Sequence, residues 1–143
     1  MIALTHRAGE LVYVFGLGMT GLSTIAALKA GGASARAWDD GKRRRDEAEA
    51  RGAQLVAPDD LDWQTISAVV LSPGVPLTHP RPHPVVELAK AHNVAVIGDT
   101  ELFIAELAHI NSPARLVAIT GTNGKSTTTA LTAHLLESAG REA

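Results

Sequence analysis

The stretch Leu11-Val-Tyr-Val-Phe-Gly-Leu-Gly-Met-Thr-Gly21 decides the fold. Its first five residues favour a strand and run directly into a turn that contains three glycines. Apolar residues then recur at helical spacing as far as Ala30. A strand, a glycine-rich turn and a helix in this order are typical of the first unit of a Rossmann-like sheet.

Strands and helices alternate beyond this unit. Gly31-Gly32 ends the first helix, because glycine adopts the left-handed cap conformation at low cost. Further strands are predicted at residues 34–38, 54–57, 66–71 and 94–97, and helices at 42–51, 84–92 and from Asp99, as the cap, through 107. Such alternation implies right-handed crossovers. We therefore expect an α/β fold with a mainly parallel, Rossmann-like sheet of about five strands and helices on both faces.

A second domain is predicted to begin near residue 112. Asn111-Ser-Pro113 breaks the preceding helix, and a fresh strand at residues 116–119 leads into another glycine-containing turn and a last helix. We predict a nucleotide-binding domain over residues 1–111. Residues 112–143 would then supply only the first strand, phosphate-binding loop and helix of an ATPase domain.

Composition excludes several classes of function. The 143 residues carry a net charge of −2 and contain no cysteine. Nucleic acid is not expected as a partner, because a phosphate-backbone binder needs a basic field. Without cysteine there is no disulfide framework and no zinc–thiolate site. The absence of cysteine fits a reducing compartment, so we expect a cytoplasmic location. The first apolar run, residues 11–17, is too short for a membrane span, so we expect no membrane partner.

The glycines of the first turn have the spacing Gly-x-Gly-x-x-Gly of a nucleotide-binding fingerprint. The first glycine permits the tight turn, Gly18 lets the backbone approach a diphosphate, and the third lets helix and strand pack closely. Amides at Met19 and Thr20 would face the anion. Asp39, at the end of the next strand, could accept a hydrogen bond from a ribose hydroxyl or a base N–H. The fingerprint fits a nicotinamide dinucleotide and a UDP-sugar equally well.

The second turn, Gly121-Thr-Asn-Gly-Lys-Ser126, also lies between a predicted strand and a helix. Amides of such a loop cradle phosphates, Lys125 supplies a point charge, and the Ser126 hydroxyl can hold Mg²⁺. A strict phosphate-binding loop would have glycine where Ile119 stands, so this is a variant of the pattern.

The segment Ile119-Thr-Gly-Thr-Asn-Gly-Lys-Ser-Thr127 closely resembles the ATP-binding signature of the Mur ligases, a family of amide-forming enzymes. Three upstream segments strengthen the match: Gly16-Leu-Gly-Met-Thr-Gly-Leu-Ser23, Leu71-Ser-Pro-Gly-Val75 and Gly98-Asp-Thr-Glu-Leu-Phe103. Together they resemble the members of the family that add D-glutamate. The resemblance spans the chain from about Leu11 to its end.

In that family the N-terminal domain binds the UDP part of UDP-N-acetylmuramoyl-L-alanine. The matching positions here are the backbone at Gly18, Met19 and Thr20, the carboxylates of Asp39 and Asp40, and Gly74. One departure concerns the base. Family members often have arginine two places after the first of these carboxylates, where this chain has Gly41 followed by Lys42.

The resemblance also implies that ATP phosphorylates the substrate carboxylate and that the amine of D-glutamate attacks the resulting acyl phosphate. The ATP site would comprise Gly121, Thr122, Asn123, Gly124, Lys125, Ser126 and Thr127. Lys125 would be catalytic, and Ser126 would contact Mg²⁺. The family's other metal ligands and its amino-acid-binding domain have no counterpart in 143 residues, so we expect the chain alone to be inactive. One strand and one helix cannot bury both faces of a second sheet, so we also expect self-association or mobility after Asn111.

Two other functions remain open. The first is a nicotinamide-dependent oxidoreductase that uses the first turn and Asp39, although a dehydrogenase has no use for the loop at Lys125. The second is a non-catalytic module that binds a UDP-sugar.

Several further residues have both a functional and a structural interpretation. His79 and His83 have the spacing of metal ligands on a helix, but prolines surround them and favour a surface loop. The basic run at residues 42–45 could attract an anion, or it could be a solvated helix face balanced by the acidic residues that follow. Trp38 could border a base or belong to the core.

Overall fold

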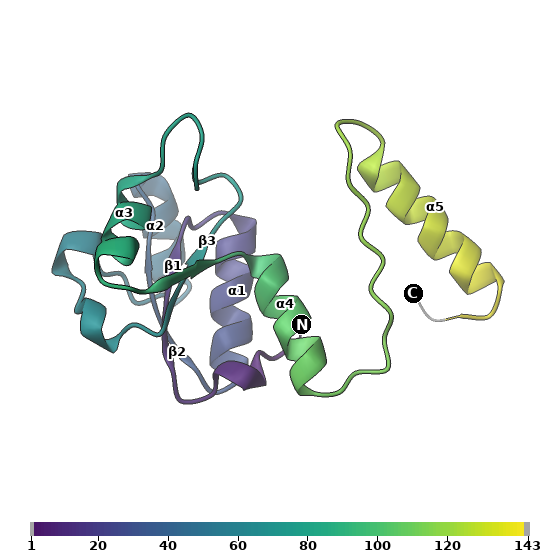
Figure 1. Cartoon of the computed structure of the whole chain (residues 1–143), viewed down its shortest axis with the longest axis horizontal. Helices are drawn as coiled ribbons and strands as arrows, with labels where there is room; N and C mark the ends of the chain where they lie inside the picture. Colours follow the sequence, from purple (N-terminus) through teal and green to yellow (C-terminus); the bar gives the residue numbers. More distant parts are fainter. Residues whose placement is uncertain (1, 142–143) are drawn as a thin grey trace. The chain divides into compact units, whose positions relative to one another are not determined.

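The computed structural model describes residues 2–141. The chain divides into two compact units, Met1–Ser112 and Pro113–Ala143. The first unit contains four strands and four α-helices in alternation (Figure 1). Its elements are η1 (Thr5–Arg7), β1 (Leu11–Phe15), α1 (Met19–Ala30), β2 (Ser34–Trp38), α2 (Lys42–Ala50), η2 (Pro58–Asp60), η3 (Trp63–Thr65), β3 (Ala68–Leu71), α3 (Pro84–Ala91), β4 (Ala95–Ile97) and α4 (Asp99–His109).

The four strands form one parallel sheet in the order β2-β1-β3-β4. Val12 of β1 pairs with Ala35 of β2 on one side and with Ala68 of β3 on the other. The connection after β1 runs to one side of that strand, and the connection after β2 returns to the other. The carboxyl ends of β1 and β3 therefore flank a topological switch point, where sheets of this type bind ligands. This arrangement confirms the predicted Rossmann-like α/β fold.

Alternate residues of β1 serve two separate cores. Val12 and Val14 pack on one face with Ile25 and Leu28 of α1, Ala48 of α2 and Leu102 of α4. Tyr13 and Phe15 pack on the opposite face with η3 and with Val85, Val86 and Ala89 of α3. Both faces of the sheet are covered, so the two central strands, β1 and β3, are apolar throughout. All four residues of β3 are buried.

Two local predictions are wrong. Residues 54–57 do not form a fifth strand; only Leu55 makes an isolated bridge, with Ala37. The pairing stops because Pro58, which lacks an N–H, follows at once and starts η2. Asp99 is the first residue of α4 rather than its cap. Gly98 occupies the cap position, without a side-chain hydrogen bond.

Two glycines of the first turn are required by close packing. A Cβ on Gly21 would lie 2.0 Å from the carbonyl oxygen of Gly16. Gly16 itself has φ +96°, and a Cβ there would lie 2.7 Å from the Ser72 Cβ. Larger residues would push α1 away from β1 and the turn away from β3, so these positions hold the turn against the sheet.

A buried carboxylate fastens the N-terminal segment to α4. Glu106 is 1% exposed and accepts hydrogen bonds from Thr5 Oγ1 at 2.5 Å and from the His6 amide at 2.9 Å. His6 Nδ1 also lies 2.7 Å from Oε2, the oxygen that accepts from the His6 amide, while Thr5 binds Oε1. Burial opposes ionisation of this carboxyl, but the hydrogen bonds outweigh it and lower the pKa of Glu106 to about 2.

The second unit contains one helix, α5 (Lys125–Ser138), which no strand accompanies among the described residues of the unit. The strand predicted at residues 116–119 is therefore not formed. A strand needs a neighbour for its N–H and C=O groups, and this unit offers none. Leu131, Leu135 and Leu136 of α5 are exposed, as are Leu116 and Val117. Across residues 2–141, no helix is both long and apolar enough to cross a membrane.

Candidate functional site

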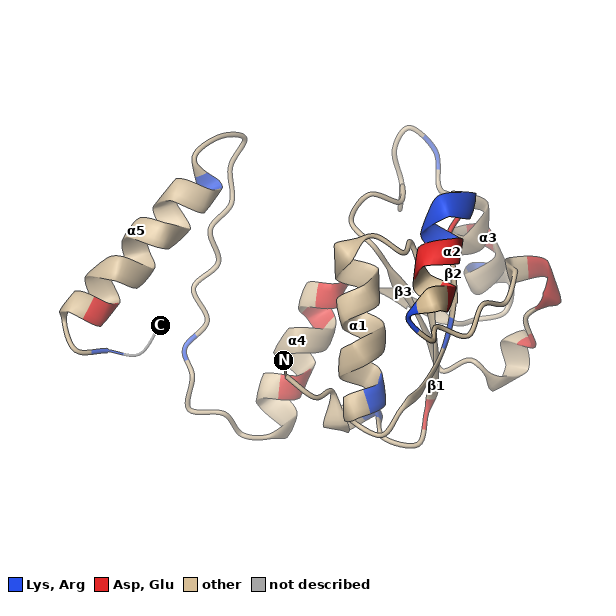
Figure 2. Cartoon of the chain, turned by 180° about the vertical axis from the view of Figure 1, so that it is seen from behind, with Lys and Arg blue, Asp and Glu red and all other residues tan. Residues whose placement is uncertain are grey.

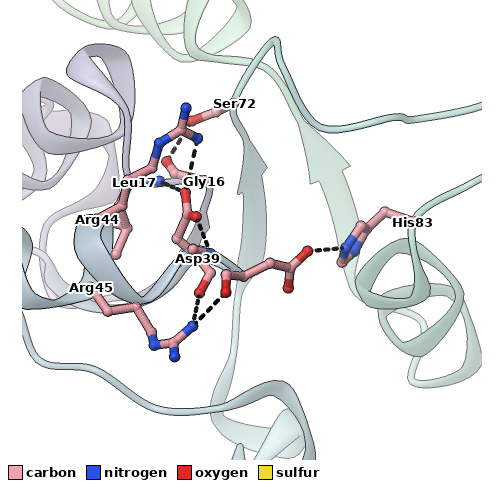
Figure 3. A network of polar contacts seen from close by, with 9 residues as sticks. Gly16, Leu17, Asp39, Arg44, Arg45, Ser72 and His83 are labelled. Atoms are coloured by element: carbon pink, nitrogen blue, oxygen red, sulfur yellow. Dashed lines mark hydrogen bonds and ion pairs between the residues drawn. The ribbon is translucent and has the colours of Figure 1, made fainter.

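Three loops meet at the carboxyl edge of the sheet: the glycine turn after β1, Asp39 to Gly41 after β2, and Ser72 to Pro76 after β3 (Figure 3). The Ser72 hydroxyl donates to the carbonyl oxygen of Gly16 at 2.7 Å, across the switch point. The Gly16 amide in turn donates to the Trp38 carbonyl at 2.9 Å. These bonds link all three strand ends, so the backbone of the glycine turn has little freedom.

The Asp39 carboxylate is used inside this network. Its Oδ2 accepts from the Leu17 amide at 2.7 Å, and its Oδ1 accepts from the Gly41 amide at 2.8 Å. Arg44 Nη1 lies 3.4 Å from Oδ2. Burial opposes ionisation of this carboxyl, yet the two amides and the guanidinium outweigh it and lower the pKa of Asp39. Asp39 therefore fixes the glycine turn against the end of β2.

The start of α1 is open where the other glycines are crowded. Gly18 is the cap residue, with no side-chain hydrogen bond, and a Cβ there would meet no atom within 4 Å. A Cβ on Gly74, in the loop after β3, would also meet no atom within 4 Å. Helix geometry leaves the first amides, including those of Met19 and Thr20, without intrahelical acceptors. Nothing in the chain itself requires glycine at these two positions for space.

A hollow of about 310 Å³ lies beside this turn, between the ends of β1, β2 and β3. We call it the first hollow. It is lined by the apolar residues Phe15, Val75 and Pro76, by the polar residues Asp39, Asp40, Arg44 and His83, and by Gly41 and Gly74. His83 Nε2 lies 2.9 Å from Asp40 Oδ2. Three of the predicted ligand-binding residues, Asp39, Asp40 and Gly74, thus line one cavity.

A second hollow, of about 510 Å³, lies on the other side of the segment after β3. Ser72, Gly74, Thr78, Gly98 and Glu101 are among its lining residues. The Thr20 side chain faces neither hollow; it lines a separate apolar depression with Leu4 and Leu102. Only the backbone of Thr20 is therefore a candidate contact at the nucleotide turn.

The first half of the basic run at the start of α2 is a solvated helix face, as one of the two interpretations of the sequence predicts. Lys42 pairs with Asp46 at 2.7 Å and Arg43 with Glu47 at 3.5 Å, so these cations are balanced on an exposed helix face (Figure 2). The next two arginines turn toward the sheet. Arg45 Nη1 donates to the carbonyl oxygens of Asp39 at 2.7 Å and Asp40 at 2.8 Å.

Trp38 is half-buried and packs against the α3 core. The Arg45 guanidinium lies over its ring, 4.6 Å from the centroid. Trp38 is thus a partner of Arg45 and a part of the core, and it is not among the residues that line the first hollow.

The second glycine turn is organised by its own residues. Gly124 adopts a left-handed conformation with φ +80° and caps α5, and Gly121 has φ +150°. The Lys125 ammonium donates to the Gly121 carbonyl oxygen, across the turn. Residues 121 to 130, which include Ser126 and Thr127, are all exposed.

Sequence reasoning missed Ser72 as a part of the first site and placed His83 in a surface loop. It considered Arg44 and Arg45 only as members of a basic run that could attract an anion. Ser72 stood within the family-like segment after β3, but its role depends on the sheet order. His83 does lie between prolines, yet it caps α3 and contacts Asp40. No group of three or more His, Cys, Asp or Glu in residues 2–141 is arranged to hold a metal ion.

Comparison with known families gives a match for residues 10–98 to the model described as Mur ligase MurD-like, N-terminal domain. Curated relatives cover nearly the whole chain. It is 51% identical over 142 residues to the "UDP-N-acetylmuramoylalanine--D-glutamate ligase" of Chelativorans sp. (strain BNC1). The proteins of the same name from Mesorhizobium japonicum and Agrobacterium fabrum are 54% and 52% identical. Each alignment covers 99% of this chain and 30% of the relative.

The fold also resembles a solved dehydrogenase. A shikimate dehydrogenase from Aquifex aeolicus matches with a TM-score of 0.52 over 78% of this chain and 51% of its own, at 15% sequence identity. A likeness at this identity concerns the fold alone.

Proposed function

Because the chain belongs to the MurD-like Mur ligases, we propose that its first unit binds the UDP part of UDP-N-acetylmuramoyl-L-alanine at the carboxyl edge of the sheet. The observation that carries this proposal is the open space at Gly18, at the start of α1. A rigid turn with free amides and no side chain in the way is what a diphosphate requires.

The groups of the ligand can be assigned to the parts of the site. The diphosphate would lie against the amides at Gly18, Met19 and Thr20 and approach Gly74, where a side chain is also absent. The nucleoside would enter the first hollow. Asp39 would act mainly by holding the turn, since both of its oxygens accept from chain amides. A remaining lone pair of the Asp39 carboxylate could still accept a hydrogen bond from the ligand. The Asp40 carboxylate is exposed and could accept one as well.

The second unit would begin the ATP site, over residues 112–143. Loop amides from Gly121 to Thr127, among them those of Thr122 and Asn123, would surround the phosphates of ATP. Lys125 would exchange its bond with the Gly121 carbonyl for a contact with phosphate, and so neutralise developing charge. Mg²⁺ accepts ligands from phosphates, waters and few protein oxygens, and the exposed Ser126 hydroxyl fits one such position. When bound, the ion would neutralise phosphate charge.

The whole protein would join D-glutamate to UDP-N-acetylmuramoyl-L-alanine in the cytoplasm, as a step of peptidoglycan synthesis. ATP would phosphorylate the substrate carboxylate, and the amine of D-glutamate would displace phosphate to form the amide. The chain spans about 30% of the length of its relatives. We propose that these 143 residues bind nucleotide but do not catalyse amide formation alone.

Calorimetric titration of the chain with UDP-N-acetylmuramoyl-L-alanine tests the proposal, with UDP and NADH as parallel titrants. We expect binding of both uridine ligands and none of NADH. Gly18→Ala should weaken uridine binding without loss of folding, because its Cβ would occupy only the ligand's space. Binding of NADH alone would instead establish the oxidoreductase alternative.

A non-catalytic UDP-sugar module would give the same titration. It is distinguished by the complete reading frame, which we expect to encode a longer polypeptide that forms the amide when ATP and D-glutamate are supplied. A purified full-length protein that binds the muramoyl nucleotide but never forms the amide would contradict the ligase assignment.

A further inference from the structure

Asn123 and Gly124 lie next to each other in the exposed turn that precedes α5 (Figure 1). The hydrogen bonds of this turn involve other groups: Lys125 donates to the Gly121 carbonyl oxygen, and the Thr128 amide donates to the Gly124 carbonyl oxygen. Within residues 2–141, neither the Asn123 carboxamide nor the Gly124 amide has a hydrogen-bond partner. An asparagine side chain and the amide that follows it are therefore both unrestrained.

The other two asparagines of the chain, Asn93 and Asn111, have different surroundings. The amide that follows Asn93 donates to the Ala89 carbonyl oxygen at 2.8 Å. The amide that follows Asn111 donates to the Leu107 carbonyl oxygen at 2.9 Å. Both of these amides close the last turn of a helix, so each is held away from the asparagine side chain that precedes it.

An unrestrained amide after asparagine can react with the side chain. Its nitrogen bonds to the side-chain carbonyl carbon, the bond from that carbon to NH₂ breaks, and ammonia leaves with the proton of the amide. The product is a five-membered imide. Attack is easiest when the next residue is glycine, because no Cβ crowds the nitrogen. The surroundings of Gly124 add no obstacle, since even a Cβ there would meet no atom within 4 Å.

Water then opens the imide at one of its two carbonyl groups. Opening at the side-chain carbonyl gives aspartate. Opening at the backbone carbonyl gives isoaspartate, in which the backbone runs through the former side chain and is one carbon longer. Both products carry a carboxylate in place of the neutral carboxamide.

A carboxylate at position 123 would oppose the binding of phosphate. Lys125 is the only charged residue between Gly121 and Thr127, so the new negative charge would cancel its positive charge. The longer backbone of isoaspartate would also move the loop amides, which must point at one centre to surround a phosphate.

We propose that Asn123 is a site of spontaneous deamidation, and that the carboxylate it produces weakens the binding of ATP phosphates by the second glycine turn. The first half of this inference rests on the exposed, unbonded Asn123 and Gly124 alone. The second half rests on the proposed ATP site. Bound nucleotide should slow the reaction, because a phosphate that accepts from the Gly124 amide restrains the attacking nitrogen.

The first test is incubation of the purified chain at mildly alkaline pH, followed by tryptic digestion and mass spectrometry. Peptide 116–125 contains Asn123, and peptide 91–115 contains both Asn93 and Asn111 as an internal control. We expect the mass gain for replacement of NH₂ by OH to appear in peptide 116–125 about tenfold faster or more, since each control amide must first break a hydrogen bond. Equal conversion of the two peptides would overturn the proposal.

A synthetic peptide with the sequence of residues 116–125 supplies the rate of an unrestrained asparagine in the same buffer. The chain should convert Asn123 at a similar rate, and an unreactive Asn123 beside a reactive peptide would overturn the proposal. Asn123→Gln is the matched variant. It keeps a carboxamide but would have to close a larger ring, so its peptide 116–125 should gain no mass.

The second test measures ATP binding in the presence of Mg²⁺ by calorimetry. Asn123→Asp reproduces the charge of the product, and we expect its ATP affinity to fall about tenfold or more, as for loss of a hydrogen bond to a charged group. Asn93→Asp adds the same charge at the end of α3 and should leave ATP affinity unchanged. Both variants should bind UDP as the wild type does. Equal ATP affinity of Asn123→Asp and wild type would overturn the second half of the inference.

Protection by ligand links the two tests. ATP with Mg²⁺ should slow the mass gain in peptide 116–125, whereas adenosine, which has no phosphate, should not. Protection by both ligands alike would contradict a contact between phosphate and the Gly124 amide. Wild-type chain that does not bind ATP would overturn the proposed ATP site and the second half of the inference, while the peptide masses decide the modification site independently.

Discussion

The two glycine-containing turns of this chain each precede a helix and are both predicted to bind phosphate. They differ in the contacts that hold them in place. The turn after β1 is tied to both neighbouring strands: Asp39 binds the Leu17 amide, and Ser72 binds the Gly16 carbonyl. The turn before α5 is held by a contact between Lys125 and Gly121, both members of the same motif. A local motif can specify the turn, but the sheet around it supplies the rigidity that a binding site needs.

The helices that follow the two turns differ in the same way. α1 buries Thr24, Ile25 and Leu28 against the sheet, whereas α5 buries none of its residues within the described part of the chain. A helix in a folded domain derives most of its stability from such packing rather than from its own propensity. The first unit is therefore expected to be much more stable than the second.

Two leucine-to-alanine substitutions, one in each helix, test this contrast. We expect them to give the largest difference in the free energy of unfolding. Leu28→Ala removes a fully buried side chain of α1 and should lower the free energy of unfolding by about 3 kcal/mol. Leu135→Ala, on exposed α5, should change it by less than about 0.5 kcal/mol. Chemical denaturation of both variants measures the two values. Similar losses would mean that α5 packs on a core in solution.

A second pair separates glycines that serve packing from the glycine proposed to serve the ligand. Gly21→Ala places a Cβ 2.0 Å from the Gly16 carbonyl oxygen and should cost about 2–3 kcal/mol through overpacking. Gly18→Ala meets no atom and should stay within about 1 kcal/mol of the wild type. Thermal unfolding distinguishes them, and a Gly18→Ala variant as unstable as Gly21→Ala would remove the reason to place a ligand there.

Glu106 provides a pH-dependent test within the first unit. Its pKa is lowered to about 2 from an ordinary 4.5, so its contribution to stability is complete above the unfolded value and is lost as the pH falls through the folded one. Glu106→Gln should cost about 2 kcal/mol at pH 7 and less at pH 3. Glu101→Gln, exposed on the same helix, is the control. Equal pH profiles for the two variants would contradict the role of Glu106 in fastening the N-terminal segment to α4.

The smallest effect on stability concerns the exposed side of the second unit. We expect Leu131, Leu135 and Leu136 to drive weak self-association of the chain, because these apolar side chains are exposed to solvent. Leu135→Glu should reduce association in sedimentation experiments and leave the melting temperature of the first unit unchanged. Slow hydrogen exchange of α5 amides in a proven monomer would show instead that this helix is stable by itself.

Much of the first unit could be predicted from the chain alone. The alternation of apolar runs and glycine-bounded helices specified the parallel α/β fold, and the predicted strand at residues 34–38 and the helix from Lys42 agree with β2 and α2. The two wrongly predicted strands fall where pairing depends on a neighbour. Residues 54–57 stop at one bridge before Pro58, and residues 116–119 have no partner strand.

Periodicity and glycine spacing thus determined the fold class, the nucleotide turn and the family resemblance, because these depend on residues close together in the sequence. Only the tertiary structure decided what Asp39, Asp40 and His83 do. Asp39 and Leu17 are 22 residues apart and Asp40 and His83 are 43 apart, so no local pattern relates them. The strand order brings them together, because parallel strands present all their carboxyl ends at one edge.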